Sequence, residues 1–201
     1  MRHEVIVFDF DGTLVDSNQI KSDGFGYAFA DCAECVSKIP QVLAKLKGLT
    51  RHEIVGALVD SIDGLSGPER ESEVSRRLEA YSAWVEDRIV ESARLSPAGE
   101  LLERWHAHAS LYICSLTPLR YLMAIVDRIG WRRFFLDVAG HPLEKRKMLA
   151  KAVVRHGVQP KDVLMVGDSD EDEAAAAAVR TAFFRIRRTS ELLDLDRYLT
   201  T

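Results

Sequence analysis

A short apolar run, Val5-Ile6-Val7-Phe8, leads directly into two acids separated by one residue, Asp9 and Asp11. The run is short and rich in β-branched residues, which predicts a buried strand of a parallel sheet. Gly12 then allows the backbone to turn sharply and to approach a ligand closely. Two carboxylates at the end of a buried strand are costly unless a cation or a reaction needs them. Their spacing suits a nucleophile paired with a general acid beside a hard metal ion.

Short apolar runs alternate with amphipathic helical patterns over much of the remaining chain. The further runs are 111–114, 134–138, 163–166 and 182–186, and helices are expected near 97–108, 118–129, 144–156, 171–179 and 190–199. Strands that alternate with helices predict an α/β fold, here a Rossmann-like parallel sheet with helices on both faces. In such a sheet, functional groups gather at the ends of the strands.

Residues 17–93 have a different pattern, in which no strand is expected. Helices are expected near 18–34, 37–47 and 51–62, and a longer amphipathic helix follows the loop that ends at Pro68. The apolar face of that helix recurs at steps of three and four residues, at Val74, Leu78, Tyr81, Val85 and Ile89. We therefore expect an α/β core at 1–16 and 94–201, interrupted by an all-helical segment at 17–93.

The composition argues against several functional classes. The 201 residues carry a formal net charge of −4 without a large basic block, which does not favour nucleic-acid binding. No apolar run approaches the roughly 18 residues of a membrane helix, and the N-terminus has no signal-peptide pattern. We expect a cytoplasmic protein with neither a nucleic-acid nor a membrane partner. The sequence leaves its oligomeric state open.

The three cysteines do not suggest a disulfide framework. Cys32 and Cys35 form a C-x-x-C pair, but a zinc site would need two further ligands at suitable spacing. The pair falls within an expected helical stretch. We therefore expect two reduced thiols on one helix face, with no role assigned to them.

Two further strand ends carry polar side chains. Ser115 follows the run 111–114 and precedes a helix, where a hydroxyl and backbone N–H groups can hold a phosphate oxygen. After the run 163–166, Asp168 and Asp172 belong to a stretch with four acids in five residues. One acid would suffice to offset a helix dipole, so the stretch favours cation binding. A positive charge opposite these acids would come from the segment Lys145-Arg146-Lys147.

These four segments, in this order, resemble the four motifs of the haloacid dehalogenase-like hydrolase superfamily. The first motif reads Asp9-Phe10-Asp11-Gly12-Thr13 and the last reads Gly167-Asp168-Ser169-Asp170-Glu171-Asp172, with Ser115 and Lys145 as the second and third. The resemblance covers essentially the whole chain. It implies a phosphatase of the β-phosphoglucomutase and phosphoglycolate phosphatase-like branch, whose small helical cap would be the inserted segment.

The resemblance also implies roles for individual residues. Asp9 would be the nucleophile that forms an aspartyl-phosphate, and Asp11 would be the general acid and base. Ser115 and Lys145 would hold the transferred phosphoryl group. Lys145 has the family's spacing to the apolar position that follows it, and Lys147 is the alternative.

The implied cofactor is Mg²⁺, with Asp9, Asp11 and Asp168 as ligands, Asp11 through its backbone carbonyl. Asp172 would complete the metal site, or would orient a water or the lysine of the third motif.

The implied substrate is a small phosphorylated metabolite, such as a sugar phosphate or phosphoglycolate. Gly12, Thr13 and Leu116 would contact it. Arg51 ends the segment 46–51, which resembles a cap loop that meets the distal part of a phosphorylated substrate in this branch. Thr50 also suits the N-cap of the helix that follows.

Three positions depart from the family pattern. Leu116 stands where many relatives carry Asn, and Arg180 stands where a Gly often closes the helix of the last motif. Lys21 stands where the mutase has a His, which disfavours a phosphosugar mutase. A dehalogenase would need neither a metal nor the second acid. A non-catalytic binding protein on the same scaffold would not need Asp9, Asp11 and Asp168 intact.

Overall fold

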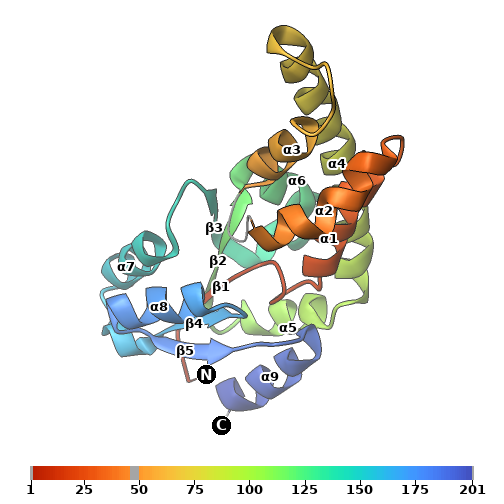
Figure 1. Ribbon diagram of the computed structural model, residues 1–201. Coiled ribbons are helices and arrows are strands. Elements are labelled where there is room, and N and C mark those ends of the chain that lie inside the picture. The colour runs from red at the N-terminus through yellow and green to blue at the C-terminus, as the bar shows by residue number, and fades with distance from the viewer. Residues whose placement is uncertain (1, 46–49, 201) are drawn as a thin grey trace. The chain divides into compact units, whose positions relative to one another are not determined.

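The computed structural model describes residues 2–45 and 50–200, and Figure 1 shows its helices and strands. The chain separates into two compact units. The α/β unit consists of Met1–Asn18 and Ile89–Thr201, and the helical unit consists of Gln19–Arg88. The helical unit therefore interrupts the α/β unit in sequence.

A parallel sheet of five strands forms the centre of the α/β unit (Figure 1). Its strands are β1 (Val5–Phe8), β2 (Ser110–Pro118), β3 (Phe135–His141), β4 (Val163–Gly167) and β5 (Ala182–Arg185). They lie in the order β3-β2-β1-β4-β5, so β1 is central and pairs with both β2 and β4. Because all pairings are parallel, the carboxyl ends of the strands meet at one edge of the sheet.

Helices cover both faces of this sheet, which confirms the predicted α/β class. They are α5 (Ala98–Trp105), α6 (Leu119–Arg128), α7 (Lys145–His156), α8 (Asp170–Val179) and α9 (Leu192–Thr200), with short 3-10 turns at Trp131–Phe134, Pro160–Asp162 and Thr189–Glu191. On one face, Val7 belongs to a buried cluster with Met148 of α7 and Ala176 of α8. On the other face, Phe8 stacks on Trp105 of α5 with ring centroids 5.6 Å apart. Strand side chains alternate, so these neighbours in β1 point to opposite faces.

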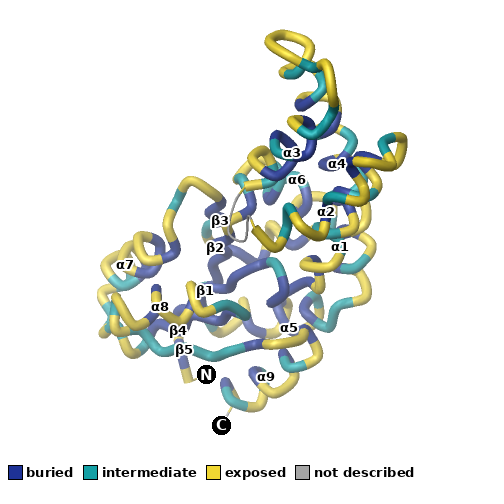
Figure 2. The backbone as a smooth tube through the Cα atoms, in the orientation of Figure 1, coloured by how far each residue is buried: buried dark blue, intermediate teal, exposed yellow. Residues whose placement is uncertain are grey.

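β1 is enclosed along its whole length. All four of its residues are buried, and Figure 2 shows the strand among the dark-blue segments. A strand covered on both faces has to be apolar at every position rather than at every second one. This explains the continuous apolar run of β1, and the first polar position after it is Asp9.

The helical unit contains most of α1 (Asn18–Ala28) and α4 (Gly67–Leu95), together with α2 (Ala33–Lys45) and α3 (Arg51–Val59). α1 packs closely on α4, because Phe25 stacks on Tyr81 at 4.5 Å and an added side chain at Gly24 would overlap Val85. Arg77 of α4 is buried and donates to the carbonyl of Ala28 at 2.6 Å, which fixes the end of α1. None of the described helices is both long and apolar enough to cross a membrane.

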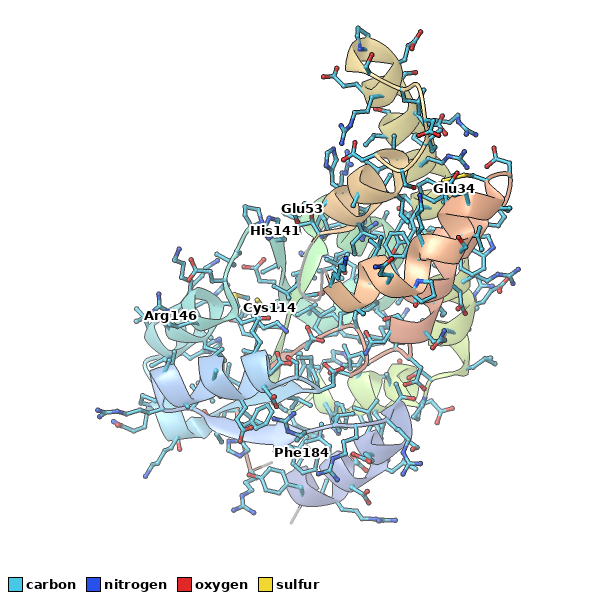
Figure 3. All side chains as sticks on the ribbon, viewed as in Figure 1. Glu34, Glu53, Cys114, His141, Arg146 and Phe184 are labelled. Carbon is cyan, nitrogen blue, oxygen red and sulfur yellow. A yellow bond between two sulfur atoms is a disulfide. The ribbon has the colours of Figure 1, made fainter. Side chains whose placement is uncertain are left out.

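The structure corrects the prediction for the first two cysteines. The helix expected at 18–34 ends at Ala28, and Cys32 lies in the turn before α2, where its N–H donates to the carbonyl of Phe29 at 2.8 Å. Cys35 is in the first turn of α2, and the two residues form a disulfide with Cα atoms 5.3 Å apart (Figure 3, beside Glu34). The prediction of two reduced thiols on one helix face is therefore wrong, because the helix begins between them.

Candidate active site

Asp9 lies one residue beyond β1, at the carboxyl edge of the sheet. Its N–H donates to the carbonyl of Val166 in β4 at 2.8 Å, which ties Asp9 to the end of the neighbouring strand. The residue is only 4% exposed. In the turn that follows, the N–H of Gly12 donates to the carbonyl of Val15 at 2.8 Å, and this turn also carries Asp11.

A buried lysine pairs with the Asp9 carboxylate. Lys145 begins α7, and its Nζ lies 2.8 Å from Oδ1 of Asp9 and 2.6 Å from Oδ1 of Asp172. Lys147, the alternative in the sequence, is exposed and pairs with Glu144 at 2.7 Å. Of the two lysines, Lys145 is therefore the one that the structure brings to the acids, and its role in holding a phosphoryl group stays a prediction.

Burial and neighbouring charges shift the pKa values of this cluster. Burial raises the pKa of Asp9 to about 7, and the nearby Lys145 ammonium opposes that rise. Burial would lower the pKa of Lys145, but the carboxylates of Asp9 and Asp172 outweigh this effect and raise it. Burial also raises the pKa of Asp168. Three acids around one lysine carry a surplus of negative charge, which a divalent cation would stabilise.

The acids are close enough to share such a cation. One oxygen from each of Asp9, Asp168 and Asp172 lies within 4.8 Å of the others. Gly12 leaves the space for this cluster, because an added Cβ would overlap the Asp168 carboxylate. Its φ of +77° is a second reason for glycine at this position. Asn18 donates to Oδ2 of Asp168 at 3.1 Å. A set of carboxylate oxygens fits a hard cation such as Mg²⁺.

Asp172 already has protein partners for both of its oxygens. Oδ1 accepts from Lys145 at 2.6 Å, and Oδ2 accepts from the N–H and hydroxyl of Ser169 at 3.1 and 2.5 Å. The contacts with Ser169 form the capping box of α8. An added Cβ at Gly167 would overlap the Asp172 side chain, which is fully buried. This geometry suits Asp172 better for orienting Lys145 than for ligating a metal directly.

Asp11 accepts hydrogen bonds from three hydroxyl groups. Ser17 donates to Oδ1 at 2.6 Å, and Ser115 and Thr117 donate to Oδ2 at 3.0 and 2.7 Å. Of these donors, the sequence predicts a role for Ser115 alone. Ser17 and Thr117 carry ordinary hydroxyls next to predicted motifs, and only the folded chain brings them to Asp11.

The predicted substrate contacts in the α/β unit differ in their exposure. Leu116 is 53% exposed and offers its side chain to solvent at the end of β2. Thr13 is fully buried, and its Oγ1 has no hydrogen-bond partner among the described residues. Gly12 is buried against Asp168. Contacts of these three residues with a substrate stay predictions.

In the helical unit, residues 46–49 of the predicted cap loop lie outside the described residues. Thr50 is the N-cap of α3 and forms a capping box with Glu53. Arg51 begins α3, and its guanidinium carbon lies 5.4 Å from the centroid of the Tyr81 ring. Arg51 and Lys21 both line a cavity of about 190 Å³ within this unit. The other lining residues are Phe25, Ile54 and Tyr81.

The motif geometry can be compared with known families. The model of the haloacid dehalogenase-like hydrolases matches residues 3–180. The chain belongs to this family. The matched range begins before β1 and ends just after α8, so all four predicted motifs of the haloacid dehalogenase-like hydrolases lie inside it.

Individual relatives agree with this assignment. The chain is 30% identical over 186 residues to a phosphoglycolate phosphatase of Synechococcus elongatus, which covers 88% of this chain and 80% of that one. A crystal structure of a predicted phosphoglycolate phosphatase from Haemophilus somnus has a TM-score of 0.72 at 20% identity, covering 97% and 98% of the two chains. A magnesium-bound haloacid dehalogenase-type hydrolase of Bacillus subtilis has a TM-score of 0.71 at 17% identity, covering 98% and 100%.

The two solved structures support the fold. The family match and the sequence relative confirm the prediction of an enzyme of the haloacid dehalogenase-like phosphatase type.

Proposed function

We propose that this enzyme hydrolyses a small phosphomonoester through an aspartyl-phosphate on Asp9, with Mg²⁺ as its cofactor. The observation that carries the proposal is the buried contact of Asp9 with Lys145, next to the acids Asp168 and Asp172. A carboxylate nucleophile and a phosphate ester repel each other. Fixed positive charge at the site removes much of that obstacle.

The reaction has two steps. In the first, an oxygen of Asp9 attacks phosphorus, and the bond to the leaving-group oxygen breaks as Asp11 gives that oxygen its proton. In the second, the Asp11 carboxylate takes a proton from water, the water oxygen attacks phosphorus, and the bond to Asp9 breaks. Inorganic phosphate leaves and both acids return to their starting states. Ser115 and Lys145 hold the phosphoryl oxygens in both steps.

Asp9, Asp168 and the backbone carbonyl of Asp11 would hold the Mg²⁺. When bound, the cation would neutralise charge on the phosphoryl oxygens and favour the ionised form of Asp9. Asp172 would keep Lys145 or a water in position, consistent with the partners of its two oxygens.

We propose phosphoglycolate, or a similarly small phosphorylated acid, as the substrate. The Synechococcus relative is named a phosphoglycolate phosphatase. The cavity of the helical unit carries the basic side chains of Lys21 and Arg51. A planar guanidinium recognises carboxylates and phosphates through paired hydrogen bonds. The helical unit would serve as the cap that selects the distal group and excludes bulk water.

A panel of phosphomonoesters assayed with and without Mg²⁺ tests the proposal, with the substrates ranked by kcat/KM. Activity should vanish with EDTA and return with Mg²⁺. Ca²⁺ should support it poorly, because its higher coordination number would draw both Asp9 oxygens onto the metal. Asp9→Asn should abolish turnover of every substrate, because an amide does not form an acyl-phosphate.

Three outcomes would contradict the proposal. Wild-type turnover by Asp9→Asn would overturn the mechanism. Full activity on the panel in a metal-free assay would overturn the role of Mg²⁺. Failure of the wild-type enzyme on the whole panel would favour a non-catalytic binding protein.

A further inference from the structure

Thr117 lies near the carboxyl end of β2, two residues after Ser115, and its side chain is buried. Its hydroxyl donates to Oδ2 of Asp11 at 2.7 Å. Its backbone N–H donates to the hydroxyl oxygen of Ser115 at 3.0 Å. One residue therefore contacts both the proposed general acid and a proposed phosphoryl-holding group.

The hydroxyls of Ser115 and Thr117 can have different roles, because each has a single proton to donate. Ser115 donates its proton to Asp11 at 3.0 Å, so it would have to release Asp11 in order to donate to a phosphoryl oxygen. Thr117 donates to the same oxygen of Asp11, at 2.7 Å. It can keep Oδ2 in place when Ser115 turns to the substrate.

The backbone around Thr117 is closely packed. Its side chain is β-branched, which restricts rotation about the first side-chain bond. Gly140 of β3 lies against this segment, because an added Cβ would be 2.6 Å from the carbonyl oxygen of Thr117 and from the backbone of Leu119. The pairing of β2 with β3 resumes at Pro118, opposite His141. Thr117 thus lies in an irregular stretch of β2 that is bounded by paired positions on both sides and packed against Gly140.

We propose that Thr117 is a positioning residue that keeps the Asp11 carboxyl oriented for proton transfer to the leaving group. The inference rests on the general acid role of Asp11 in the proposed function. Ser17 holds the other oxygen, Oδ1, at 2.6 Å. Loss of Thr117 would therefore weaken the hold on Oδ2, where Ser115 alone of the two strand-end hydroxyls would still donate, and leave the contact at Oδ1 in place. The expected result is a misplaced acid in an otherwise intact site.

The test compares two substrates that differ in their need for an acid. The leaving group of p-nitrophenyl phosphate is a nitrophenolate, which departs readily without a proton. The leaving group of an alkyl ester such as phosphoglycolate is an alkoxide, which needs a proton to depart. The ratio of kcat/KM values reports this need, because kcat/KM covers only the steps up to departure of the leaving group. Thr117→Val should lower kcat/KM for phosphoglycolate about 10- to 100-fold, a part of what general acid catalysis supplies. The value for p-nitrophenyl phosphate should fall less than about threefold.

Three further variants complete the experiment. Thr117→Ser keeps the hydroxyl and should restore most of the activity on phosphoglycolate. Thr189→Val is a matched control, because Thr189 is also buried and donates to a carboxylate, that of Asp16, at 2.7 Å. It should leave the substrate ratio unchanged. Thr117→Ala repeats the test should the valine variant be poorly folded, as judged by circular dichroism.

The outcomes distinguish the inference from the function on which it rests. Asp11→Asn must itself show the difference between the two substrates, and if it does not, the acid role of Asp11 and the inference both fail. Suppose that Asp11→Asn shows the difference. If Thr117→Val and Thr117→Ala then lower kcat/KM equally for both substrates, or change it for neither substrate, only the inference fails. Failure of Thr117→Ser to rescue would also overturn it.

Discussion

Lys145 and Lys147 are two positions apart in the sequence but lie in opposite environments. Lys145→Met removes the charge that pairs with Asp9 and Asp172, and kcat should fall about 10²–10³-fold, the usual cost of losing one stabilising donor at a reacting centre. Lys147→Met removes an exposed partner of Glu144, so kcat should change less than about twofold. Steady-state kinetics on both variants check this. Comparable losses of kcat in both variants would contradict the assignment of Lys145.

Arg51 allows a prediction about specificity. If its guanidinium meets the distal acid of the substrate, Arg51→Ala should lower kcat/KM for phosphoglycolate about 10- to 150-fold, the value of one charge-assisted contact. A generic aryl phosphate lacks that group and should be turned over almost as before. Arg70→Ala is a suitable control, because Arg70 lies in the same unit and pairs with Asp60 at 2.5 Å. Equal losses on the two substrates would leave Arg51 with a structural role only.

Among the secondary-structure elements, α8 ends in an unusual way. Arg180 follows its last residue in the left-handed conformation, with φ of 64°, and is the one non-glycine residue with positive φ in the described ranges. The family often places Gly at this position, and glycine would adopt this conformation without strain. Because a side chain in this conformation is sterically strained, Arg180→Gly should stabilise the protein by roughly 1 kcal/mol.

Urea unfolding measures this change in stability. Arg180→Ala separates the backbone effect from the loss of the exposed arginine side chain, since alanine keeps the Cβ that causes the strain. The alanine variant should gain little stability. A gain as large as that of the glycine variant would mean that the arginine side chain, rather than the backbone conformation, was unfavourable.

For the molecule as a whole, His3 should make stability depend on pH. It is buried before β1, where its ring nitrogens lie 3.2 Å from the carbonyl oxygen of Asp162 and 3.1 Å from the hydroxyl of Tyr198 in α9. Burial lowers the pKa of His3, and the hydrogen bond to the Asp162 carbonyl only partly opposes this. The unfolded chain takes up a proton at His3 below about pH 6.5, and the folded chain takes it up only at lower pH.

The stability contribution of His3 is therefore fully present above about pH 6.5 and is lost as the pH falls through the lowered pKa. Melting temperatures of the wild type and of His3→Gln, measured between pH 7.5 and pH 5, check this prediction. The wild type should lose more stability than the variant over that range, because glutamine does not titrate. Parallel curves for the two proteins would show that His3 titrates alike in the folded and unfolded chains.

The strands and the acids of the site could be predicted from the sequence because their signals are local. The apolar run before Asp9 predicts β1 with the bounds that the structure shows, because a strand buried on both faces tolerates no polar residue. The four acids after 163–166 likewise mark the start of α8. The ends of the helices were predicted less accurately. The break between α1 and α2 comes at Phe29–Cys32, whereas the sequence pattern predicted a helix that continues to residue 34.

Other features depended on contacts between residues far apart in the chain. Lys145 rather than Lys147 contacts Asp9 because of the side of α7 on which each lies, and the spacing of the two lysines left both contacts possible. The disulfide joins residues only three apart, Cys32 and Cys35, but it required the turn that ends α1, which the sequence pattern did not predict. The contact of Thr117 with Asp11 joins residues 106 positions apart. The sequence by itself determined which chemical groups stand at each strand end, and the parallel pairing of β1 with its neighbours decided which of them meet, because only that pairing brings the strand ends to one edge.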